Sequence, residues 1–196
     1  MLVYIHGANA TPDSFNYLRK CINEPDRTLS YSCSNSFVDN LRDMHDQLSN
    51  ETQVTFIAHS LGGVYAWYLA DLLGKKCIQG ITMSTPYGGS KAANSLRYMA
   101  PGSVLFKDIA TDSPIIRGVK KIQNPQPWCN IVSTLGHNPW IPEPNDGVVT
   151  RYSMRAIKNM FYFDVATNHY EILLNDQVVE IIKRRLAAVD VVRPVV

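Results

Sequence analysis

One serine in this chain lies in a sequence setting that can make its hydroxyl a nucleophile. Ser60 follows the apolar run Val54–Ile57 and precedes a helical pattern from Val64 to Leu73. A strand, a tight turn carrying one serine and then a helix form a nucleophile elbow. Such a turn needs small residues two positions before and after the serine, and Ala58 and Gly62 meet that need. The pattern predicts a nucleophilic Ser60, although alanine replaces the more usual glycine at the first small position.

A serine hydroxyl reacts only when a base takes its proton, and histidine is the usual base. The chain has five histidines, and His169 is the one that follows the last expected strand and precedes the final helix. That position delivers an imidazole to the carboxyl edge of a parallel sheet. We therefore expect His169 to be the base, with His137 in a proline-rich loop as its rival.

The histidine in turn needs an acid that orients its ring. The loop after the fifth expected strand offers Glu143 and Asp146. Asp146 precedes Gly147, a turn signal that lets a carboxylate reach a neighbouring loop. Glu143 stands between two prolines and is the weaker candidate. The resulting order, Ser60, Asp146, His169, matches the nucleophile–acid–histidine order of one class of α/β enzymes.

Ester chemistry also needs two N–H donors that hold the developing oxyanion. Leu61 directly follows the nucleophile at a helix N-terminus, where the helix dipole favours negative charge. The loop after the first strand, His6 to Ala10, contains a glycine at position 7. We expect the backbone N–H groups of Leu61 and Ala8 to form the oxyanion hole.

Strands and helices alternate along the chain, which predicts a doubly wound α/β fold with a mostly parallel, six-stranded sheet and helices on both faces. Ligand sites in such sheets lie at the carboxyl ends of strands. The expected helices span about 13–23, 37–48, 64–73 and 175–187. The expected strands are Leu2–Ile5, Thr28–Tyr31, Val54–Ile57, Cys77–Met83, Cys129–Val132 and Met160–Val165.

Residues 90–127 interrupt this alternation. The segment contains four prolines, and its six Lys and Arg residues outnumber its two acids. We expect a small helical excursion or cap within one domain that spans 1–196. A solvated surface crossover with incidental charge is the alternative, and a basic surface that contacts a membrane or a partner is a further one.

Composition excludes several classes of protein. Of the 196 residues 45% are hydrophobic and 18% are charged, and the net charge of +2 is too small to indicate nucleic-acid binding. No run approaches the ~18 apolar residues of a membrane span, and the chain opens on a strand without a leader. The four cysteines show no metal-ligand spacing and are expected to be free thiols. These features predict a cytoplasmic protein without a metal ion or cofactor, and they leave peripheral membrane contact and oligomeric state open.

Five motifs in order carry a resemblance to a known family. The chain resembles the α/β-hydrolase superfamily, and within it the compact bacterial lipases and esterases without a large lid. The resemblance implies the same Ala8 oxyanion donor, and it implies that the stretch 84–90 borders the substrate pocket. Tyr87, where relatives often carry histidine, and His6 are accordingly expected to contact substrate. The motifs are Ile5–Gly7, Ala58–Gly63, Ser84–Ser90, Asn145–Val149 and Asn168–His169.

The resemblance and the residues together predict a serine hydrolase that cleaves carboxylic esters of a small molecule or a lipid. A thioesterase or a deacetylase would use the same three side chains, and the sequence does not separate these activities. A catalytically inactive protein that keeps the fold for binding or scaffolding is the alternative from another class.

Overall fold

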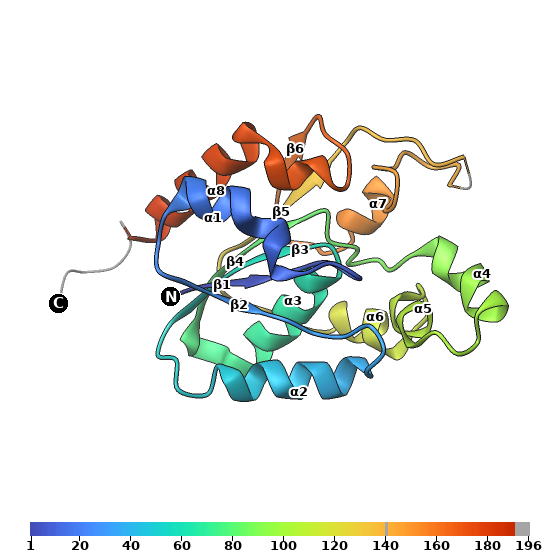
Figure 1. Ribbon diagram of the computed structural model, residues 1–196, viewed down its shortest axis with the longest axis horizontal. Coiled ribbons are helices and arrows are strands. Elements are labelled where there is room, and N and C mark those ends of the chain that lie inside the picture. The colour runs from blue at the N-terminus through green and yellow to red at the C-terminus, as the bar shows by residue number, and fades with distance from the viewer. Residues whose placement is uncertain (140, 191–196) are drawn as a thin grey trace.

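A single parallel sheet organises the protein (Figure 1). The computed structural model describes residues 1–139 and 141–190. Six strands lie in the order β2-β1-β3-β4-β5-β6, and every neighbouring pair is parallel. The predicted fold class is confirmed. The strands are β1 (Leu2–Ile5), β2 (Asp26–Leu29), β3 (Val54–His59), β4 (Cys77–Met83), β5 (Trp128–Ser133) and β6 (Phe161–Val165).

The inner strands are apolar because helices cover them on both faces. Every residue of β1, β3 and β5 is buried, whereas the edge strands β2 and β6 expose part of theirs. The second strand was expected at Thr28–Tyr31 and begins two residues earlier, at Asp26. At this edge polar residues are tolerated, and Asp26 pairs with Arg19. Tyr31 has left the sheet and stacks on the ring of His6.

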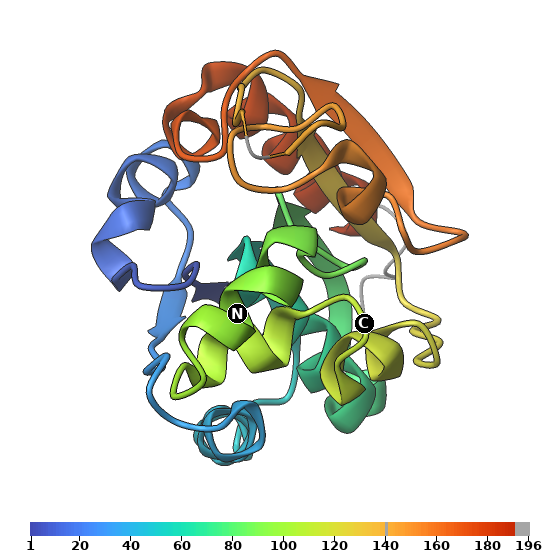
Figure 2. The ribbon, with the colours of Figure 1, turned by 90° about the vertical axis from the view of Figure 1, so that its right-hand side faces the viewer.

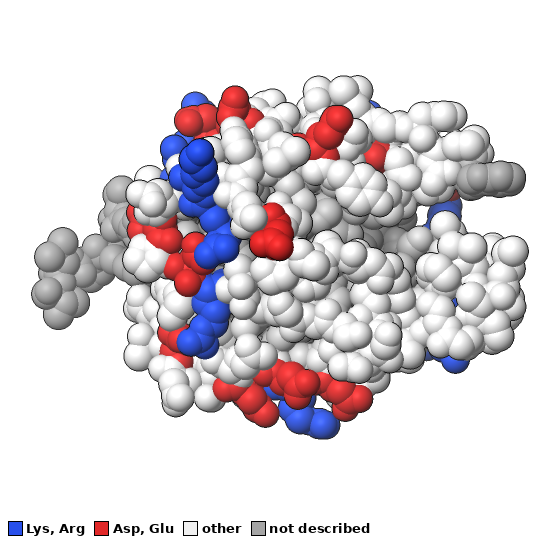
Figure 3. Space-filling model, viewed as in Figure 1, with Lys and Arg blue, Asp and Glu red and all other residues white. Residues whose placement is uncertain are grey.

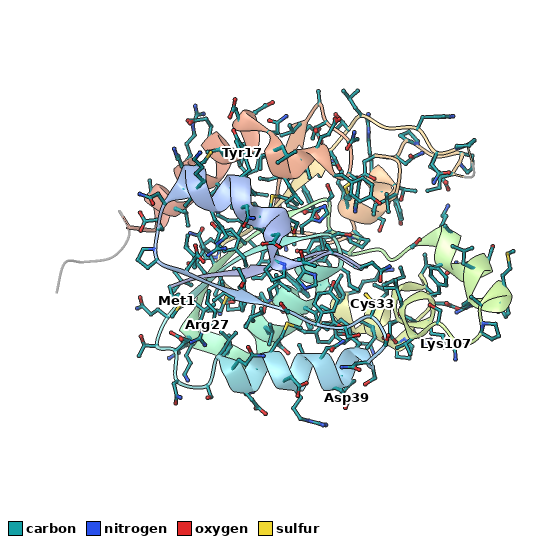
Figure 4. All side chains as sticks on the ribbon, viewed as in Figure 1. Met1, Tyr17, Arg27, Cys33, Asp39 and Lys107 are labelled. Carbon is teal, nitrogen blue, oxygen red and sulfur yellow. The ribbon has the colours of Figure 1, made fainter. Side chains whose placement is uncertain are left out.

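Helices α1 (Asn16–Ile22) and α8 (Asp176–Asp190) cover one face of the sheet, and α2 (Phe37–Gln47) and α3 (Leu61–Leu73) cover the other (Figure 1). The two faces form separate apolar clusters. On the first face lies Tyr17 of α1, which Figure 4 labels. Its hydroxyl donates to the carboxylate of Asp176 at the start of α8.

Short helical turns complete the connections. A 3-10 turn at Pro12–Phe15 precedes α1, so the helix expected from residue 13 is divided in two. Two further 3-10 turns, Gly74–Lys76 and Glu171–Leu174, lead into β4 and α8. The four-residue helix α7 (Arg151–Met154) follows the loop after β5.

Between β4 and β5 the chain folds into three short helices, α4 (Lys91–Met99), α5 (Val104–Ile109) and α6 (Pro114–Val119). A serine side chain caps each helix by accepting a backbone N–H three residues later. Figures 1 and 2 show α4 and α5 projecting beyond the carboxyl ends of the strands.

Charged side chains are unevenly spread over the surface. In the view of Figure 3 most of them gather toward the amino ends of the strands and on the outer helices, and the part formed by α4, α5 and α7 is mostly uncharged. All four cysteines are free, two buried (Cys77, Cys129) and two half-buried (Cys21, Cys33). Among the helices in 1–139 and 141–190, none is long and apolar enough to cross a membrane.

Candidate active site

The turn between β3 and α3 holds Ser60 in a strained backbone conformation. Its φ of 52° and ψ of −126° lie in a region that L-residues rarely adopt. The Ser60 N–H donates to the carbonyl of Met83 at 2.8 Å, and its carbonyl accepts from Gly63 N at 3.0 Å. These bonds hold the turn from both sides, and the side chain is left at the carboxyl edge of the sheet.

The small residues around Ser60 are required by packing. A Cβ atom on Gly62 would overlap the backbone carbonyl groups of Ile5 and His6. A Cβ atom on Gly63 would overlap the side chain of Thr85. Because these glycines have no side chain, the first turn of α3 packs directly on the end of β1 and on the residues after β4. Helix α3 therefore begins at Leu61, three residues before the start that the sequence pattern predicted.

Ser60, His169 and Asp146 are joined by two hydrogen bonds. The Nε2 atom of His169 lies 3.0 Å from Ser60 Oγ, and its Nδ1 atom lies 2.7 Å from Asp146 Oδ2. His169 and Asp146 are 3% and 1% exposed. An ionised carboxylate only accepts, so Nδ1 carries the proton and Nε2 is free to accept from the serine hydroxyl. The structure thus brings together the three side chains that the sequence predicted.

Asp146 is surrounded by donors. Its Oδ1 atom accepts from the N–H groups of Val148 at 3.0 Å and Val149 at 2.7 Å. Its Oδ2 atom accepts from Ser133 Oγ at 2.5 Å as well as from His169. Burial raises the pKa of the Asp146 carboxyl, but the bonds from His169, Ser133 and the backbone outweigh it and leave the pKa below its usual value. Asp146 is therefore ionised at neutral pH.

Backbone contacts fix the loop that carries His169. The N–H of His169 donates to the carbonyl of Asp146 at 3.1 Å. The carbonyl of His169 lies 2.8 Å from Nε2 of His59, the residue before Ser60. Burial, followed by the neighbouring His169, lowers the pKa of His59 to about 3. His59 is therefore neutral and donates from Nε2, which ties the loop after β6 to the end of β3.

The rival candidates lie in other surroundings. Glu143 forms an ion pair with Lys91 at the start of α4, and this contact lowers the pKa of its carboxyl. Within the described part of the chain, the histidine bonded to Ser60 Oγ is His169, and His137 makes no such contact.

Leu61 follows Ser60 in the chain, and the loop that carries Ala8 passes close to Ser60 at Gly7. A Cβ atom on Gly7 would stand 2.9 Å from His59 Nδ1 and 3.2 Å from Ser60 Cβ, so the loop after β1 passes directly over the elbow. A turn closes this loop, with Ala10 N bonded to Gly7 O at 3.3 Å and Asn9 at a φ of 54°. Within the described residues, the N–H groups of Ala8 and Leu61 have no hydrogen-bond partner. Their role as oxyanion donors stays a prediction.

Tyr87 was expected to contact substrate, and the structure places its side chain away from the surface. Its side chain is fully buried in the core. Its hydroxyl lies 2.9 Å from Thr82 Oγ1 and accepts from Trp128 Nε1 at 2.8 Å, below the sheet edge that carries Ser60. His6 is also buried, with Nδ1 2.8 Å from the Gly7 carbonyl and its ring stacked on Tyr31. His6 shapes the loop beside Ser60 from within.

Two serines that the sequence reasoning missed join the site. Ser133, the last residue of β5, bonds Asp146, and Ser84, directly after β4, lies 2.7 Å from Ser133 through their Oγ atoms. Both are fully buried. Their one sequence signal is a polar residue at the carboxyl end of a strand, the same signal that identified Asp146 and His169.

A separate cavity of about 740 Å³ opens at the amino ends of β5 and β6. Trp67, Trp128, Lys120, Asn124 and Lys158 are among its lining residues. It lies at the opposite edge of the sheet from Ser60 and includes none of the predicted site residues.

Comparison with known proteins gives structural relatives only. No protein-family model and no curated protein matches the sequence. A solved structure of the metagenome-derived lipolytic enzymes LipS and LipT superposes with a TM-score of 0.72 at 14% identity, over 96% of this chain and 92% of the other. Bacillus licheniformis lipase BlEst2 in its mature form gives 0.71 at 14% identity, over 94% and 91%.

Phospholipase PlaB from Legionella pneumophila gives a TM-score of 0.66 at 14% identity, and this chain spans 79% of its own length but only 44% of that larger protein. Identity this low carries the fold and not the substrate. What these lipases and lipolytic enzymes share with this chain is the fold. With its six parallel strands, the chain has the compact α/β-hydrolase fold.

Proposed function

We propose that this protein is a serine hydrolase that cleaves carboxylic esters through an acyl-enzyme on Ser60. The observation that carries the proposal is the unbroken line of hydrogen bonds from Ser60 Oγ through His169 to Asp146. The three groups come from three different loops at one edge of the sheet, and each has the partner that its role in acyl transfer needs.

In the proposed first step, Ser60 Oγ attacks the ester carbonyl carbon while His169 Nε2 takes the hydroxyl proton. The carbonyl oxygen becomes an oxyanion held by the N–H groups of Ala8 and Leu61. The carbon–oxygen bond to the alcohol then breaks, and His169 returns the proton to the leaving oxygen. Asp146 stays ionised and stabilises the imidazolium that forms between the two transfers.

In the second step a water molecule attacks the acyl-enzyme with His169 again as base. The acid is released, and Ser60 recovers its proton. Nothing in this cycle consumes a cofactor. The partner of the enzyme is accordingly its ester substrate, a small molecule or a lipid.

The test combines a probe with a substrate series. A fluorophosphonate should label the wild-type protein at Ser60 and leave Ser60→Ala unlabelled. Hydrolysis of p-nitrophenyl esters from acetate to palmitate, with one acyl thioester beside them, should then be lost in the same variant. A wild-type protein that neither reacts with the probe nor turns over any of these substrates would contradict the proposal and favour a binding or scaffold role.

A further inference from the structure

The carboxylate of Asp146 accepts more hydrogen bonds than the one that orients His169. Four donors converge on it, two backbone N–H groups on Oδ1 and two side chains on Oδ2. The second of those side chains is Ser133, whose hydroxyl bond of 2.5 Å is as short as a charge-assisted O–H···O⁻ bond. Ser133 lies on β5, an element that carries none of the predicted site residues.

The direction of this bond follows from charge. An ionised carboxylate has no proton to give, so Ser133 must donate to Asp146 Oδ2. The proton of Ser133 is then committed, and the 2.7 Å contact between the Oγ atoms of Ser133 and Ser84 requires Ser84 to donate. Four hydrogen bonds therefore form one continuous chain that meets at Asp146. Two run from Ser84 through Ser133 to its carboxylate, and two run from Ser60 through His169 to the same carboxylate.

Ser84 is held in place in an unusual way. Its φ of 50° is close to the 52° of Ser60, and the two residues follow the adjacent strands β4 and β3. Its N–H donates to the carbonyl of Ile131 at 2.9 Å, which anchors it to β5. A non-glycine residue keeps such a backbone conformation only where its surroundings demand it. Both ends of the hydrogen-bond chain are therefore serines in strained conformations.

We infer that Ser133 is a positioning residue for the proposed ester hydrolysis and that Ser84 orients Ser133. The inference rests on the proposed function for its kinetic consequences, whereas the hydrogen-bond chain itself is measurable without any substrate. Ser133 and His169 both donate to Oδ2 of Asp146. The bond from Ser133 lowers the basicity of the carboxylate, and it keeps the carboxylate from rotating away from the imidazole.

The consequence for the histidine has a definite sign. When the Ser133 donor is removed, the Asp146 charge is less neutralised and attracts the imidazolium more strongly, so His169 holds its proton to higher pH. Among the described residues, the other titratable groups seen beside the pair are His59 from β3 and Tyr170, whose rings lie next to that of His169. Further out, His6 from the loop after β1 acts on His59, and Arg151 donates to the carbonyl of Thr134. None of these is altered by removing one hydroxyl from Ser133.

The experiment is an NMR titration of the His169 Cε1–H resonance in the whole protein, without substrate. In Ser133→Ala the midpoint should move to higher pH by about 0.5–1 unit, the scale of one hydrogen bond to a carboxylate. Ser84→Ala should move it less and in the same direction. Ser113→Ala removes another buried serine hydroxyl, from the cap of α6, and should leave the midpoint of His169 unchanged.

Kinetics supply the second readout. In Ser133→Ala the acid limb of the kcat/KM profile should move with the NMR midpoint, and kcat should fall about tenfold with little change in KM. Ser133→Cys keeps a weak donor and should lie between wild type and alanine. If Ser133→Ala does not fold, the titrations of Ser133→Cys and Ser84→Ala decide.

The two failures can be told apart. A His169 midpoint that is the same in Ser113→Ala and in the folded Ser133 and Ser84 variants would overturn the inference, whatever the activity. A wild-type protein without hydrolase activity, combined with the expected shift of the midpoint, would overturn the proposed function and leave the hydrogen-bond chain standing.

Discussion

The side chain of His59 donates to the backbone carbonyl of His169, at 2.8 Å and across 110 residues of sequence. His59, the last residue of β3, thereby joins the strand that leads into Ser60 to the loop that carries the proposed base. Nε2 can donate this bond whether the ring is neutral or charged, but burial, followed by the neighbouring His169, lowers the pKa of His59 to about 3 and keeps the ring neutral. One histidine thus holds the position of another without taking part in proton transfer.

This relationship predicts how stability depends on pH. His59 titrates near 6.5 when the chain is unfolded and only near 3 when it is folded, so the unfolded state binds more protons between these values. Its contribution to stability is complete above about pH 6.5 and falls by up to about 1.4 kcal/mol per unit as the pH drops toward 3. Urea unfolding at several pH values should show this slope.

The variant His59→Gln keeps a side-chain donor and lacks the titrating ring, so its stability should depend less steeply on pH in the same window. Asp146, whose pKa is lowered, adds a further loss of stability only below about pH 4 in both proteins. An equal slope in wild type and His59→Gln between pH 6.5 and 4.5 would contradict the assignment.

The strain at Ser60 predicts different stabilities for two variants that lack its hydroxyl. Ser60→Ala keeps the unfavourable φ of 52°, and its free energy of unfolding should stay close to that of wild type. Ser60→Gly relieves a strain of about 1–3 kcal/mol and adds less than that in chain entropy. It should be more stable than Ser60→Ala by about 1 kcal/mol in urea unfolding. Equal stability of the two variants would show that the turn is not strained.

Asp146→Asn tests the acid. The asparagine is nearly isosteric and keeps the backbone donors, but it cannot neutralise the imidazolium. By comparison with other serine triads, kcat should fall by about 10⁴-fold. Glu143→Gln removes the rival carboxylate, which is paired with Lys91 near the surface, and should change kcat little. The reverse ranking of these two variants in an ester assay would exchange their roles.

Packing of the elbow against the first strand predicts a large effect of one methyl group. Gly62→Ala would place a Cβ atom onto the carbonyl groups of Ile5 and His6, which are backbone and cannot move aside. Stability should fall by about 3 kcal/mol or more, and activity should be lost with it. Gly102→Ala is the control, because its Cβ atom would meet nothing within 4 Å. Its unfolding midpoint should lie close to that of wild type.

Much of this arrangement could be predicted from the sequence because its signals are local. Apolar runs marked the buried strands, and parallel strands send all their carboxyl ends to one edge, so residues that follow strands were expected to meet. For this reason Ser60 and Asp146 each lie within hydrogen-bond distance of His169. The edge strand β2 was predicted two residues too late, because it is partly polar and its apolar signal is weak.

The tertiary structure alone decided where individual side chains point. Tyr87 follows a strand like the site residues do, yet Thr82 and Trp128 bind its hydroxyl within the core. Ser133 and His59 also gave no sequence signal for their partners, because Asp146 and His169 come from distant loops. Sequence by itself determined which strand ends carry the candidate site residues. The direction of each side chain, and with it the hydrogen bonds that orient the carboxylate, depends on packing between segments far apart in the chain.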